Sequence, residues 1–82
     1  MTKTEIQDLI DEQTAIILSN QDKLSSSDYK VIKCAEATIQ DQPMPYDVNQ
    51  LIAERKGYRK AINDASDEIE RLERIEPEVL NQ

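Results

Sequence analysis

Apolar residues recur at steps of three and four between Asp47 and Ile75, in the second half of the sequence. This spacing is typical of the contact line between helices that wind around each other. A helix of that length would extend about 43 Å at 1.5 Å per residue. The pattern therefore predicts one long amphipathic, coiled-coil-like helix over residues 47–75. The positions of its contact line, called the seam below, are Val48, Leu51, Arg55, Tyr58, Ile62, Ala65, Ile69 and Leu72.

A second periodic segment begins close to the N-terminus. Thr2 and Glu5 have the spacing of a capping box, so we expect a helix to begin at Thr2 or Thr4 and to run to about residue 24. Its stripe includes two polar residues, which either fix the register of helix pairing or lie at a wet edge of the contact; we favour the wet edge. The stripe comprises Ile6, Leu9, Ile10, Gln13, Ile16, Ile17, Asn20 and Leu24.

Three consecutive serines at residues 25–27 follow this stripe. Serine side chains compete with helical hydrogen bonds inside a helix but satisfy free amides at its start. We therefore expect a second helix over about residues 27–40, with Ser26 or Ser27 as its N-cap. Pro43 and Pro45 then interrupt helical geometry, and Asp47 caps the third helix.

These elements predict a single all-α domain, residues 1–82, with three helices over about 3–24, 27–40 and 47–75. Two arrangements fit. Either each helix turns back along the previous one in a bundle, or the first and third helices form an antiparallel hairpin with the second bridging their ends. Pro77 ends the long helix near residue 75, and we expect residues 76–82 to be a frayed tail.

The composition predicts a thin core. The chain is 38% hydrophobic and contains no Phe and no Trp, and a domain of this size buries only about 60% of its unfolded surface. One cysteine, Cys34, forms no internal disulfide, and without histidine a structural zinc site lacks its usual ligands. Association is the remaining remedy, so we expect a homo-oligomer or a protein partner.

The second half of the long helix is the part that the rest of the chain should fail to cover. We therefore expect the oligomer or partner interface there. Taking Val48 as position a of a heptad places Val48, Ile62 and Ile69 at a, and Leu51 and Leu72 at d. β-Branched residues at a with leucine at d favour a parallel two-stranded pairing. The interface residues are Tyr58, Ile62, Ala65, Ile69 and Leu72.

The formal net charge of −7 argues against general nucleic-acid binding and against an anionic membrane surface. No apolar run approaches the roughly 18 residues of a membrane span. The residues from Met1 to Glu5 lack the features of a secretion signal, so we expect a cytoplasmic protein.

The candidate catalytic chemistry is sparse. Histidine is absent, and neither a glycine-rich phosphate loop nor a calcium-loop spacing is found. Lys30 and Lys33 lie near Cys34 and would favour its thiolate, but no base or orienting acid accompanies the thiol. We interpret Cys34 as a small packing residue and expect a non-enzymatic protein without cofactor or metal.

Four basic residues form the one local charge feature: Arg55, Lys56, Arg59 and Lys60 share one side of the long helix, beside Tyr58. They predict a site for an anion or an acidic partner. The alternative, which we favour, is that this side packs against the acidic first helix of the same or a neighbouring chain.

Two segments resemble small phage and prophage proteins of the tail region. The first is the run from Leu24 to Lys33, of sequence LSSSDYKVIK, followed by Glu36. After the proline-containing break, the second contains Glu54-Arg55, Tyr58-Arg59 and Ile62-Asn63. The resemblance covers about residues 24–75, with Tyr29 where a tryptophan is common, and it carries over no functional residue.

What the resemblance implies is an accessory role in tail assembly, with the protein associated with the virion. A non-enzymatic assembly protein is therefore our leading functional hypothesis. The alternative is a regulatory adaptor that binds a host protein through the exposed seam of the third helix.

Overall fold

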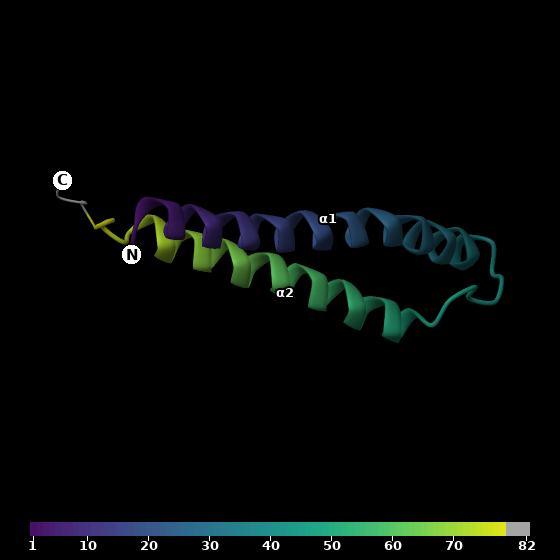
Figure 1. The fold of residues 1–82 in the computed structure, drawn as a ribbon. Helices are drawn as coiled ribbons and strands as arrows, with labels where there is room; N and C mark the ends of the chain where they lie inside the picture. The colour runs from purple at the N-terminus through teal and green to yellow at the C-terminus, as the bar shows by residue number, and fades with distance from the viewer. Residues whose placement is uncertain (79–82) are drawn as a thin grey trace.

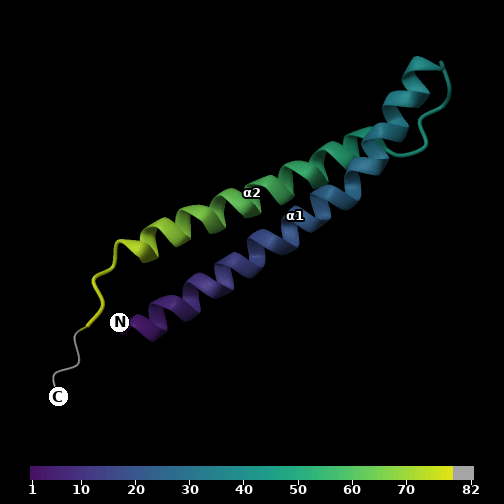
Figure 2. The same cartoon turned by 90° about the horizontal axis from the view of Figure 1, so that it is seen from above.

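The computed structural model describes residues 1–78, which contain two α-helices and no strand. α1 covers Lys3–Ile39 and α2 covers Val48–Glu73. The helices lie side by side and antiparallel, with the N-terminus beside the end of α2 and the connecting segment at the opposite end (Figures 1 and 2). The hairpin is a rod of 71 × 15 × 14 Å with a radius of gyration of 19.3 Å, whereas a compact chain of this length would have about 12 Å.

The all-α class and the hairpin are confirmed, but the prediction of three helices is wrong because α1 continues through the three serines. Ser27 does not cap a helix. Its hydroxyl donates a 2.8 Å hydrogen bond to the carbonyl of Leu24, one turn earlier, and the side chain is buried. No proline or glycine interrupts this segment, and contact with α2 outweighs the small helix-propensity cost of serine.

The helix ends form as local chemistry predicts. Thr2 and Glu5 form the capping box, in which the Thr2 hydroxyl accepts from the Glu5 amide and the Glu5 carboxylate accepts from the Thr2 amide. Asp47 caps α2 by accepting from the Gln50 amide at 3.0 Å.

The C-terminal end of α1 is closed by a Schellman motif. The amide of Gln42 donates to the Ala37 carbonyl at 2.8 Å, and the amide of Asp41 donates to the Thr38 carbonyl at 3.3 Å. Asp41 has a φ of 54° there, in the left-handed region where glycine is usual. The chain then turns through the two prolines to Asp47.

The register of the hairpin follows from a contact between Ser27 of α1 and Arg55 of α2. Counting outward from it by steps of three and four on both helices places Leu24 opposite Tyr58. The other layers of this register are Ile10–Leu72, Gln13–Ile69, Ile17–Ala65, Asn20–Ile62, Val31–Leu51 and Cys34–Val48. The seam of α2 is therefore matched by a seam of equal spacing on the antiparallel α1, and the parallel pairing between copies stays a prediction.

This pairing leaves a thin core, as expected. The buried apolar residues among residues 1–78 are Ile6, Ala37, Leu51, Ala65 and Leu72. Polar residues occupy several layers of the α1 seam, and Asn20 donates to the Ile16 carbonyl of its own helix at 2.8 Å. Asn20 thus makes no cross-helix hydrogen bond, in line with a wet edge.

The premise that too little chain remains to cover the second half of α2 is wrong. Ala65 is 3% exposed and Leu72 is 1% exposed, because α1 is long enough to run back along the whole of α2. Tyr58, Ile62 and Ile69 are half-buried in the same seam. An oligomer interface at these five residues stays a prediction, but they are already in contact with the chain's own first helix.

Met1 and Glu78 meet beyond the end of α2. Arg74 caps the helix, slightly earlier than predicted, and its amide donates to the Arg71 carbonyl at 3.3 Å. The Glu78 amide donates to the Met1 carbonyl at 2.8 Å, and the N-terminal ammonium pairs with the Glu78 carboxylate at 3.1 Å. The predicted tail of residues 76–82 thus begins with a contact to the N-terminus, and residues 79–82 lie outside the described part.

Candidate protein-binding groove

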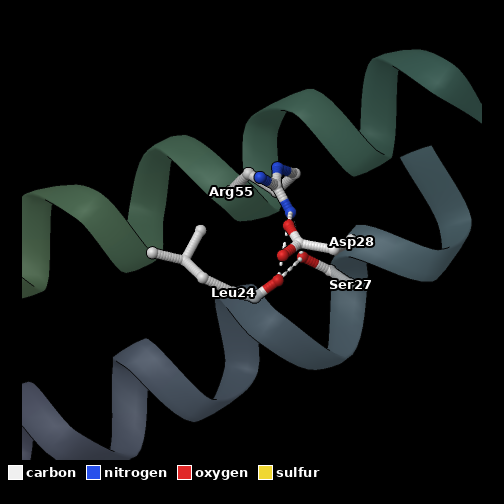
Figure 3. Close-up of polar contacts among 4 residues, drawn as sticks. All are labelled: Leu24, Ser27, Asp28 and Arg55. Atoms are coloured by element: carbon white, nitrogen blue, oxygen red, sulfur yellow. Dashed lines mark hydrogen bonds and ion pairs between the residues drawn. The ribbon is translucent and has the colours of Figure 1, made fainter. Parts of the chain in front are cut away.

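A polar cluster around Arg55 joins the two helices about one third of the way from the loop (Figure 3). The Nη1 atom of Arg55 donates to the Leu24 carbonyl at 3.1 Å, to the Ser27 hydroxyl, and to the Asp28 carboxylate at 2.9 Å. The Arg55 side chain is only 16% exposed, whereas that of Asp28 is 58% exposed. A basic residue is tolerated at this seam position because three acceptors on α1 accept hydrogen bonds from its guanidinium.

The predicted basic patch is consequently divided by the fold. Arg55 turns toward α1, as the structural interpretation of the patch expects. Lys60 pairs with Asp64 of its own helix. Lys56 and Arg59 are exposed and form no ion pair within residues 1–78. Of the four residues of the predicted patch, only these two are thus exposed without an ion pair in the described part of the chain.

Lys56 and Arg59 border an apolar groove between α1 and α2, close to the connecting segment. The groove has a volume of about 380 Å³. Its floor contains three exposed apolar side chains: Val31 is 40%, Val48 36% and Ile52 48% exposed. The complete lining is Val31, Cys34, Val48, Leu51, Ile52, Arg55, Lys56 and Arg59.

A slightly larger hollow, of about 440 Å³, lies at the opposite end of the rod. Its apolar members are the buried Ile6 and Leu72 and the half-buried Ile75 and Pro77, and they are surrounded by Lys3, Gln7 and Glu73 among others. Unlike the groove near the loop, it contains no large apolar side chain that is exposed. The groove near the loop is therefore the better candidate for a binding site.

The pKa shifts in the structure belong to exposed pairs along the helices. The Thr2 amide and hydroxyl lower the pKa of Glu5, and the hydrogen bond with Arg71 lowers the pKa of Glu68. Asp64 raises the pKa of Lys60, and Glu68 raises that of Arg71. None of these groups lines the groove, so the shifts do not mark it as a site of proton transfer.

Cys34 lies half-buried in the groove lining, where it packs beside the apolar floor. Within residues 1–78, no group of three or more Cys, Asp or Glu side chains is placed to hold a metal ion. No helix in this part of the chain is long and apolar enough to cross a membrane. The chemistry offered by the groove is apolar contact bordered by positive charge.

Lys56 and Arg59, which border the groove, were predicted from the sequence as part of a binding site, whereas most of the apolar floor was not. Val31 and Ile52 were not singled out as site residues, because neither position is remarkable in its own helix. The available signal was the pair of apolar residues Val48 and Ile52, four residues apart and beside the basic positions. It becomes a groove only when α1 places Val31 and Cys34 next to it.

The cluster around Arg55 also brings together the two segments that resemble phage proteins. Leu24, Ser27 and Asp28 come from the first segment and Arg55 from the second. No protein-family model, no curated protein and no solved structure matches the chain.

Proposed function

We propose that the chain is a non-enzymatic interaction protein that binds another protein through the groove near its loop. The observation that carries this proposal is the exposed apolar floor of Val31, Val48 and Ile52, bordered by Lys56 and Arg59. Apolar surface that stays exposed between two packed helices is costly to leave in water, and burying it against a partner is favourable.

The geometry suits a helical segment better than a small molecule. The groove is a surface channel lined by residues of both helices, and its floor lacks the converging polar groups that orient a small ligand. A rod with a thin seam also gains stability from a partner that lays a further helix against it. An assembly role in a phage or prophage tail is the more specific form of the proposal, and its support is the resemblance of residues 24–75.

A photo-crosslinking amino acid placed at Ile52 tests the proposal in the cells that naturally produce the chain. The matched control carries the same amino acid at Leu18, which is 60% exposed on α1 and does not line the groove. We expect a discrete protein adduct from position 52 that is absent from position 18. An absence of adducts at position 52, or the same adducts at both positions, would contradict the proposal.

A further inference from the structure

The charge of the hairpin is strongly divided along its length. Residues 23–60, which form the half nearer the loop, contain seven basic and five acidic side chains. Residues 1–22 and 61–82, which form the half with the termini, contain three basic and twelve acidic side chains. The groove thus lies in the one positive part of an acidic protein.

The groove also ends abruptly. Positions seven residues apart share a face in a coiled coil, so Ile52 and Arg59 continue along α2 as Ser66 and Glu73. These two continuing positions are polar and exposed. On α1 the same steps lead from Val31 to Leu24, Ile17 and Ile10, which are half-buried in the seam and so extend no exposed floor. The apolar floor and basic rim therefore extend only from about Val48 to Arg59, roughly 17 Å or three helical turns.

From this combination we infer that the groove binds a short acidic amphipathic helix of a partner protein. Apolar side chains at i, i+3 or i+4 and i+7 would enter between Val31, Val48 and Ile52. Carboxylates on the flank of that helix would face Lys56 and Arg59. This inference rests on the proposed function and names the chemistry of the partner.

Two occupants from the chain itself fit less well. The residues that follow α2 leave from the end of the rod opposite the groove (Figure 1). Glu78 is held beside Met1, at the far end of the rod. In a closed pair of two copies, the face that carries the groove must also supply the residues that fill the groove of the other copy. Along α2 this face continues toward the terminal half of the rod as Ser66 and Glu73, which are polar.

The thiol of Cys34 lines the groove, so its accessibility to a reagent reports whether the groove is occupied. The probe is a 14-residue peptide with leucines at positions 2, 5, 9 and 12 and glutamates on the flanks, compared with the same peptide carrying lysines instead. Anisotropy of the labelled peptide measures affinity, and the rate at which Cys34 reacts with Ellman's reagent reports occupancy. Circular dichroism confirms that each variant keeps its helices.

The glutamate peptide should bind and slow the Cys34 reaction. Lys56→Glu with Arg59→Glu should weaken its binding about tenfold or more, because two attractions become repulsions. The same double variant should gain affinity for the lysine peptide. The matched control, Lys60→Glu with Arg71→Glu, changes the net charge equally outside the groove and should bind the glutamate peptide nearly as well as the wild type.

Several results would overturn the inference. One is the absence of Cys34 protection at 1 mM glutamate peptide, and another is equal binding of the lysine peptide. An equal loss in the control variant would attribute binding to net charge. Self-association in sedimentation equilibrium that Ile52→Asp abolishes would assign the groove to a second copy. In each of these cases, a specific protein adduct at position 52 would still support the proposed function. If that adduct were also absent, both the inference and the proposed function would be contradicted.

Discussion

Arg55 provides the sharpest test of how the hairpin is held in register. Its side chain is mostly buried and donates to three acceptors on α1. Nη1 has only two N–H groups for its three acceptors, and the cost of desolvating the guanidinium offsets most of the gain from the partly buried bonds. The bonds to Leu24 and Ser27 should therefore contribute about 0.5 kcal/mol net together. Asp28 is largely exposed, so its ion pair should add only about 0.5 kcal/mol. With the packing of the aliphatic stem, Arg55→Ala should destabilise the hairpin by about 2–3 kcal/mol.

Arg55→Met should be much milder, within about 1 kcal/mol of the wild type, because the stem continues to fill its layer of the seam. Removal of the guanidinium leaves no buried acceptor without a hydrogen bond. The Ser27 hydroxyl keeps its hydrogen bond to the Leu24 carbonyl, and Asp28 remains in water. The predicted order of stability is therefore wild type and Arg55→Met together, then Arg55→Ala.

Thermal unfolding followed by circular dichroism measures this order. At about 4–8 °C per kcal/mol for a domain of this size, Arg55→Ala should lower Tm by about 10–20 °C. Arg59→Ala, an exposed arginine one turn later, serves as the control and should shift Tm by less than about 4 °C. Runs at two protein concentrations separate unfolding from association. If Arg55→Met proved as destabilising as Arg55→Ala, the assignment of most of the loss to packing would be wrong.

Three further predictions concern the backbone and the helix ends. Gly57→Ala should stabilise the hairpin by about 1 kcal/mol in urea unfolding, since no atom lies within 4 Å of the added Cβ; a loss would reveal a neighbour packed on this face. Asp41→Gly should also stabilise, by about 1 kcal/mol, by relieving the positive φ, and an unchanged Tm would refute this. Glu5 has a pKa lowered below 4.5 in the folded state, so its contribution to stability is present above that pH and is lost as the pH falls through the lowered value. Thr2→Pro, compatible with a φ of −78°, removes both the amide N–H and the hydroxyl of Thr2 and should return the pKa of Glu5 in an NMR titration toward 4.5.

Local chemistry alone determined the helix ends and the helical class. The Thr2–Glu5 box, the Asp47 cap and the break at the two prolines depend on side chains and backbone only a few residues apart, so their spacing in the sequence is sufficient. The seam of α2 could also be predicted from the sequence, because apolar residues at steps of three and four indicate which face of a helix is covered.

Which part of the chain covers the seam of α2 was decided only by the tertiary structure. Ser25, Ser26 and Ser27 have the composition of a helix start, yet Ser27 lies inside a helix because Arg55, 28 residues later, packs against it. That contact joins two helices and adds hydrogen bonds that no local rule includes. It converts two short predicted helices into one long one. The antiparallel register then lays the N-terminal part of α1 along the second half of α2.

The groove was decided in the same way. Lys56 and Arg59 could be identified as a basic pair on one side of a helix, but the sequence alone did not separate them from Arg55 and Lys60. The antiparallel register turned Arg55 inward and brought Val31 and Cys34 beside Val48 and Ile52. A helical period defines faces, whereas a binding surface requires two faces to be placed together, and only the packing of α1 against α2 does that.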